Sequence, residues 1–124
     1  MPSIERPLSG PVLTFRLEEE RAHVTDPAIL GRSGRNARTL IKEGPLRVTL
    51  VVLGPGGSIP AHRADGPITV QPLEGRLRFW VGDEEHELGP GDILSAAAGV
   101  EHSVASEAGA TFLLTIALAL RARP

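Results

Sequence analysis

Glycine and proline interrupt this chain every few residues from Gly44 onward. These frequent interruptions limit the lengths of the helices and strands that the chain can form. The 124 residues include 14 glycines and 11 prolines. Glycine adopts backbone angles that other residues avoid, and proline neither donates a backbone hydrogen bond nor continues a helix. The pattern therefore predicts short strands joined by tight turns over most of the chain.

Runs of β-branched and apolar residues between these breaks mark the expected strands. The clearest is residues 46–53 (LRVTLVVL), and Glu74-Gly75 separates two runs, residues 68–73 and 76–81, that we interpret as a hairpin. Further strands are expected at residues 37–42, 102–105 and 111–120. Two more are expected after the turn at Gly82-Asp83 and, as a short strand, within the sequence LGPGDIL. Many short strands at close spacing predict an all-β antiparallel sandwich or barrel.

The first part of the chain is less regular. Residues 17–24 (LEEERAHV) favour a short helix, and Asp26-Pro27 should end it because the residue before a proline avoids helical angles. We expect two parts in the chain. Residues 1–36 form an N-terminal extension that packs on the barrel, and residues 37–124 form the barrel domain.

Composition and charge exclude several classes of function. The chain has no cysteine, which rules out disulfides, thiolate catalysis and zinc–thiolate sites. Its net charge of −2 offers no basic excess for nucleic acid or an acidic membrane surface. The longest apolar stretch, residues 112–120, is too short to span a bilayer, and the N-terminus lacks the apolar core of a signal peptide. We expect a cytoplasmic protein without nucleic-acid or membrane partners.

Two strands indicate how the sheets are covered. In residues 76–81, Leu77 and Phe79 should face the interior, while Trp80 should face outward among arginines. In residues 111–118 both alternating faces are largely apolar, so both should be covered. A second layer of the same chain or a second subunit would provide this cover, and we favour a homodimer.

Two motifs in this chain resemble those of the small single-domain bacterial cupins. The first cupin motif reads G-x5-H-x-H-x3-E-x6-G, and the second reads G-x5-P-x-G-x2-H-x3-N. The matching residues are Gly56, His62 and Gly75 in the first motif and Gly91, Gly99 and His102 in the second. The similarity covers residues 38–119. It implies a small jelly-roll barrel, also called a double-stranded β-helix, with a site inside where many cupins bind iron, manganese, nickel or zinc.

The resemblance also shows that half of the usual metal ligands are missing. Ala64 and Ile68 stand where the second histidine and the glutamate of the first motif are expected. Only His62 and His102 therefore carry over as metal ligands. Two neutral nitrogens seldom hold a divalent ion against water, so at least a third ligand would be needed.

Three residues near the histidines are considered as that third ligand, and none is well placed. Asp65 is expected in a turn, and Glu101 should point to the opposite face from the histidine beside it. Gln71 would reach the interior only if a bulge at Pro72 shifted the alternation of its strand.

Three interpretations of the histidine pair therefore stay open. The pair binds a divalent metal (iron, manganese, nickel or zinc) with help from water or a ligand. It is a pair of interior residues that hydrogen-bond each other, a water or the backbone. Or it belongs to a metal-free site and contacts a ligand or acts as acid and base.

From these observations we predict a small cupin that binds a small molecule in its barrel with weak or no metal. Such a ligand would be apolar or aromatic, with one or two polar atoms read by the histidines. One alternative is a metal-dependent enzyme of the dioxygenase or isomerase type that uses His62 and His102. Another is a structural or regulatory dimeric module. The sequence assigns no catalytic residue. The expected pocket lining is Ile68, Val70, Gln71, Leu77 and Phe79.

Overall fold

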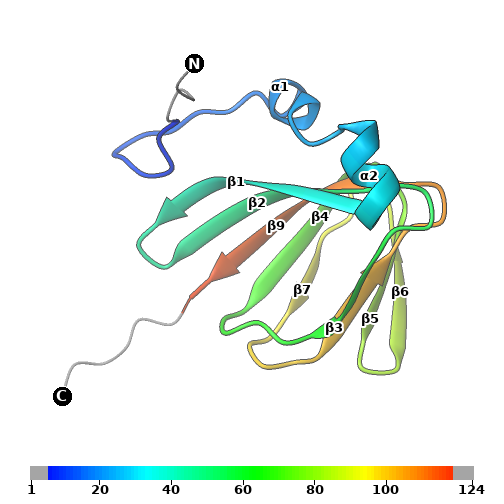
Figure 1. Ribbon diagram of the computed structural model, residues 1–124. Coiled ribbons are helices and arrows are strands. Elements are labelled where there is room, and N and C mark those ends of the chain that lie inside the picture. Colours follow the sequence, from blue (N-terminus) through cyan, green and yellow to red (C-terminus); the bar gives the residue numbers. More distant parts are fainter. Residues whose placement is uncertain (1–5, 119–124) are drawn as a thin grey trace.

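The computed structural model describes residues 6–118, which form two helices and two antiparallel β-sheets packed face to face (Figure 1). The helices are α1 (Leu17–Ala22) and α2 (Pro27–Ser33). The strands are β1 (Arg35–Glu43), β2 (Leu46–Leu53), β3 (Ser58–His62), β4 (Ile68–Gly75), β5 (Leu77–Val81), β6 (Glu84–Leu88), β7 (Leu94–Ala96), β8 (His102–Ala105) and β9 (Ala110–Ala117).

The order of the strands in the two sheets is that of a jelly roll. One sheet has five strands in the order β1-β2-β9-β4-β7, and the other has four in the order β3-β8-β5-β6. From β2 onward the chain crosses repeatedly between the sheets, and the last strand returns to lie beside β2. The predicted all-β jelly-roll fold is therefore confirmed.

The main hydrophobic core lies between the two sheets. Val70 and Leu77 are fully buried, and Phe79 and Phe112 are each 2% exposed. These side chains come from strands of both sheets. They meet in the core because alternate residues of each strand point to the same face of its sheet. Leu77 and Phe79 face inward and Arg78 is exposed, as the alternation predicted. The other buried members are Val51, Leu53, Ile68, Leu88, Ala96, Val104 and Ala110.

The predicted hairpin across Glu74-Gly75 is wrong. β4 pairs with β7 and β9, whereas β5 pairs with β6 and β8 in the other sheet. Gly75 has a φ of +79°, and a Cβ added to it would lie 2.3 Å from the carbonyl oxygen of Gly109. Only glycine fits this corner, at which the chain passes from one sheet to the other.

Most strand predictions agree with the structure, with one omission. β2 and β8 have the predicted bounds, and the turn at Gly82-Asp83 joins β5 to β6 as a true hairpin. β3 was not predicted, because its sequence (SIPAH) contains a proline and lacks a run of β-branched residues. The strand predicted at residues 111–120 ends at Ala117, and residues 119 and 120 lie outside the described part of the chain.

The N-terminal segment contains a second helix that the sequence analysis missed. α1 ends at Ala22, close to the predicted end. Asp26-Pro27 then begins a new helix, α2, because the Asp26 side chain accepts a hydrogen bond from the Ala28 amide at 2.9 Å and proline suits the first helical turn. Across residues 6–118, neither helix has the length or the apolar character of a membrane span.

Both helices belong to a segment that lies over the outer face of the five-stranded sheet near β1 and β2 (Figure 1). Val24, which follows α1, is 2% exposed and belongs to a second buried cluster. The cluster also contains Leu40, Leu50 and Val52, with Phe15, Leu17, Leu30, Ile41 and Leu113 packed against it. The segment 1–36 was predicted to pack on the barrel as a separate extension, and the division at residue 36 stays a prediction.

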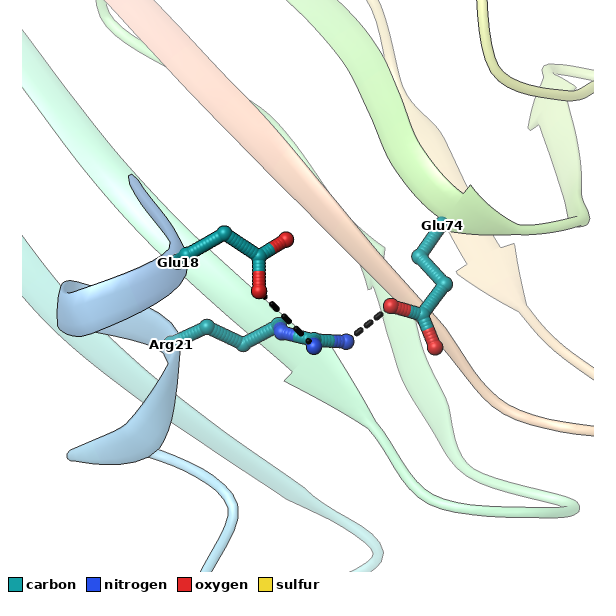
Figure 2. A network of polar contacts seen from close by, with 3 residues as sticks. All are labelled: Glu18, Arg21 and Glu74. Atoms are coloured by element: carbon teal, nitrogen blue, oxygen red, sulfur yellow. Dashed lines mark hydrogen bonds and ion pairs between the residues drawn. The ribbon is translucent and has the colours of Figure 1, made fainter. Parts of the chain in front are cut away.

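Ion pairs supplement this apolar contact. Arg21 on α1 bonds with Glu18 of its own helix and with Glu74 at the end of β4 (Figure 2). Arg38 on β1 bonds with Glu20 at 2.8 Å, and both of these side chains are largely buried. These pairs tie the helix to two different strands of the sheet.

Residues of the same chain cover part of the outer face of β9. Leu113 lies on the outer face of the sheet and packs against the buried cluster that contains Val24. The N-terminal segment therefore provides part of the cover that a second subunit was expected to provide on this face. The homodimer stays a prediction.

We expect burial, and not the ion pairs, to hold the N-terminal segment in place. Val24→Ala should lower the free energy of unfolding by about 2 kcal/mol, because it removes two buried methyl groups. Glu74→Gln should lower it by less than about 1 kcal/mol, because an exposed ion pair contributes little. Urea denaturation measures both changes. Val12→Ala is the matched control, since Val12 is 79% exposed. Equal effects of the two valine substitutions would contradict this account.

Candidate functional site

The fold brings the two motif histidines into direct contact. His62 ends β3 and His102 begins β8, and the two residues are opposite each other in the antiparallel pairing of these strands. Their Nε2 atoms lie 3.1 Å apart. The ring centroids are 4.3 Å apart and the ring planes meet at 67°. The resemblance of the two motifs to a known family predicted that these residues belong together, and the strand register accounts for their contact.

The two histidines differ in their surroundings. His102 is 5% exposed, and its ring stacks on Phe79 with centroids 5.5 Å apart. His62 is exposed at the end of an edge strand. Burial lowers the pKa of His102 below the ordinary histidine value; the hydrogen bond with the Val100 carbonyl opposes this shift, and the charge of a protonated His62 adds to it. His102 therefore favours the neutral state.

Backbone contacts determine the tautomer of each ring. Nδ1 of His62 lies 2.9 Å from the carbonyl oxygen of Pro60, and Nδ1 of His102 lies 3.1 Å from that of Val100. A carbonyl oxygen only accepts hydrogen bonds, so each Nδ1 must carry the proton and donate it. Both neutral rings then have a bare Nε2, and these two lone pairs face each other.

Two facing lone pairs at this distance need a positive or proton-donating group between or beside them. One proton shared by the two Nε2 atoms turns the contact into an N–H···N hydrogen bond. A hydrogen-bond donor on a ligand satisfies the exposed Nε2 of His62 in the same way. The pair is therefore an acceptor site, and the carbonyls of Pro60 and Val100 orient it. The only sequence signal for these two positioning residues is that each precedes its histidine by two positions.

The spacing of the histidines would suit a metal, but the donor set around them does not. Two ligands at about 2.1 Å from one ion lie roughly 3.0–3.4 Å apart, close to the observed separation. Ile68, however, is 2% exposed within the core, and Ala64 packs against the same core. Both place hydrocarbon where the family has a carboxylate and an imidazole.

The candidate third ligands do not complete the site. Glu101 lies 3.4 Å from Arg63, with which it forms an ion pair. Within residues 6–118, no group of three or more histidine, cysteine, aspartate or glutamate side chains is arranged to hold a metal ion. This donor set does not fit the usual cupin metal centre.

Most of the predicted pocket lining is solid core. Ile68, Val70, Leu77 and Phe79 are each at most 2% exposed and pack against one another between the sheets. Five hollows stand out on the described part of the chain, and none is lined by these residues or by either histidine. The pocket lining at Ile68, Val70, Leu77 and Phe79 stays a prediction.

Gln71 also lies elsewhere than the pocket prediction placed it. The bulge that would have turned it inward occurs between Pro72 and Glu74, after Gln71. The alternation of β4 is therefore undisturbed at this position, and Gln71 is exposed on the outer face.

The comparisons with known proteins identify the family. Residues 49–116, more than half of the chain, match the family model for the cupin domain, so the chain belongs to the cupins. No curated protein sequence matches it. A cupin superfamily protein from Desulfitobacterium hafniense is similar in structure, with a TM-score of 0.66, 19% identity, and coverage of 68% of this chain and 78% of that one.

Two further solved structures share the fold at low identity. Salicylate 1,2-dioxygenase from Pseudoaminobacter salicylatoxidans superposes with a TM-score of 0.79 and 17% identity over 91% of this chain, which corresponds to only 37% of the dioxygenase. KdgF from a Halomonas species superposes with a TM-score of 0.62 and 16% identity, covering 77% of this chain and 84% of that one. These likenesses concern the fold.

The buried state of His102 predicts a pH dependence of stability. The unfolded chain takes up this proton near the ordinary pKa, about 6.5, whereas the folded chain takes it up only at lower pH. The contribution of His102 to stability is therefore present above about pH 6.5 and is lost as the pH falls toward the folded-state pKa. Urea denaturation between about pH 7.5 and about pH 5.5 measures this slope.

Substitution isolates the contribution of His102. His102→Gln should flatten the pH profile relative to the unchanged protein, because the titrating group is gone. Gln71→Ala, at an exposed position that carries no titrating group, should leave the slope unchanged. A slope that His102→Gln leaves intact would show that other groups cause it.

Proposed function

We propose that this cupin binds a small molecule beside the His62–His102 pair and does so without a tightly held metal. The observation that supports this proposal most strongly is the approach of the two Nε2 atoms to 3.1 Å, with each Nδ1 against a backbone carbonyl. One of the two rings is exposed, and the other is fixed by stacking on Phe79. A ligand that approaches from solvent meets the His62 ring first.

The chemistry of the pair defines what such a ligand offers. Each Nδ1 is occupied by a backbone carbonyl, so the Nε2 atoms accept hydrogen bonds and do not donate them in the neutral state. A ligand with an acidic O–H or N–H, such as a phenol or an imide, supplies the donor that the pair lacks. Partly buried apolar side chains nearby, including Ala64 and Val81, suit the apolar body of such a molecule.

The metal-enzyme alternative requires donors that the site does not offer. The likeness to salicylate 1,2-dioxygenase keeps that alternative in view, but at 17% identity it concerns the fold. Ala64 and Ile68 supply no ligand atom. A weak metal site completed by water stays an outcome of the test below.

The first measurement is metal content by mass spectrometry, on protein purified without a metal-affinity tag and then supplied separately with iron, manganese, nickel and zinc. We expect far less than one ion per chain in every case. Near-stoichiometric metal that is lost in both His62→Gln and His102→Gln would contradict the proposal. It would mean that these two nitrogens hold an ion with non-protein ligands.

The second measurement is binding of small phenols and imides, followed by NMR of the histidine side chains. We expect the ring signals of His62 and His102 to shift, and His62→Gln to weaken binding at least about fivefold, the value of roughly one hydrogen bond. His86→Gln is the matched control, because His86 lies on β6 beside Glu84. Equal binding by both variants would argue against the pair as the site.

A further inference from the structure

The two sheets do not cover each other completely, and a hollow results at one side. In antiparallel pairing, residues opposite each other share a face of the sheet. Ala37 on β1 is opposite Val51 on β2, and Val51 faces the core at 5% exposure. Ala37 shares that inner face and yet is exposed. The four-stranded sheet, whose edge is β3, therefore stops short of β1.

Figure 1 shows the same arrangement, with β1 and β2 on the side of the molecule away from β5 and β6. The hollow under this overhang has a volume of about 410 Å³. Its walls come from three strands of one sheet and one of the other, mainly through Ala37, Thr49, Val51, Ile59 and Leu114. Most of this surface is apolar, and neither histidine contributes to it. It is a place distinct from the His62–His102 pair.

A single charged side chain lines this hollow. Arg35, the first residue of β1, is exposed, and its Nη1 donates to the carbonyl oxygen of Ser58 at 3.0 Å. This bond uses one of the five N–H donors of a guanidinium group. Nearby polar side chains are already engaged: the Ser33 hydroxyl donates to the Arg35 carbonyl, and the Asn36 amide oxygen accepts from the Ala37 amide.

Half of the arginines within residues 6–118 bond to a glutamate, and Arg35 is among those that do not. Arg21, Arg38, Arg63, Arg76 and Arg78 each bond to a glutamate. Within residues 6–118, Arg35 has no carboxylate within 4.0 Å. Its positive charge is therefore available beside an apolar surface, and planar guanidinium donors match the geometry of a carboxylate.

We propose that the hollow beneath β1 and β2 is a binding site for an organic anion with an apolar body. The apolar body lies against Val51, Ile59 and Leu114, and its carboxylate is bound by Arg35. This site is independent of the function proposed for the histidine pair.

Three ligands with the same eight-carbon chain test the charge and the apolar contact separately: octanoate, octanol and octylammonium. Isothermal titration calorimetry at low salt should give the tightest binding for octanoate. Arg35→Gln should weaken octanoate binding about two- to fivefold and leave octanol binding unchanged. Arg32→Gln is the matched control, because Arg32 lies on α2 and outside the lining of the hollow. It should leave all three affinities unchanged.

A second variant tests the hollow itself. Ala37→Phe places a large ring into the hollow from an exposed strand position and should abolish octanoate binding without unfolding the protein, which circular dichroism checks. His62→Gln should leave octanoate binding intact, so that failure of this proposal and failure of the histidine proposal are distinguishable. Loss of octanoate binding in His62→Gln would overturn the independence of the two sites.

Two further outcomes would overturn the proposal. Equal affinity for octanoate and octanol, or no binding of either, would show that Arg35 and the apolar walls do not form an anion site. Light scattering that gives a dimer in the unchanged protein and a monomer in Ala37→Phe would show that a second copy of the chain covers the hollow.

Discussion

The packing of the two sheets against each other is the contact on which the rest of this structure depends. Val70, Leu77, Phe79 and Phe112 fill the space between the sheets and are almost fully buried. Protein interiors of this kind pack about as densely as organic crystals. His62 and His102 meet where β3 ends and β8 begins, and an open apolar surface lies where β1 and β2 overhang β3.

Local sequence patterns predicted those features that depend on neighbouring residues. The alternation in β5 identified its inward face, and glycine and proline located most of the turns. A pattern cannot distinguish a hairpin from a corner, however, because Glu74-Gly75 ends a strand in either case. Whether β5 pairs with β4 or with β8 depends on residues far along the chain. Asp26-Pro27 is similarly ambiguous, since the pair that ends one helix also caps the next.

The candidate site shows the same division between local and long-range information. The resemblance to cupins predicted that His62 and His102 belong together. The motif also showed that Ala64 and Ile68 stand where two metal ligands are expected. The state of the pair depends on backbone carbonyls at Pro60 and Val100, which no residue type signals. The hollow beside Arg35 depends on how far one sheet extends past the other, which is set by strand register and not by any motif.

The measurement that tests the central claim most directly is the tautomeric state of the two histidines by long-range ¹H–¹⁵N NMR above neutral pH. The four histidine rings of the chain are assigned with His62→Gln and His102→Gln variants. The account predicts a protonated Nδ1 and an unprotonated Nε2 in both His62 and His102. A protonated Nε2 in either ring, with a bare Nδ1, would contradict it, because the carbonyls of Pro60 and Val100 would then have no donor and the pair would not be an acceptor site.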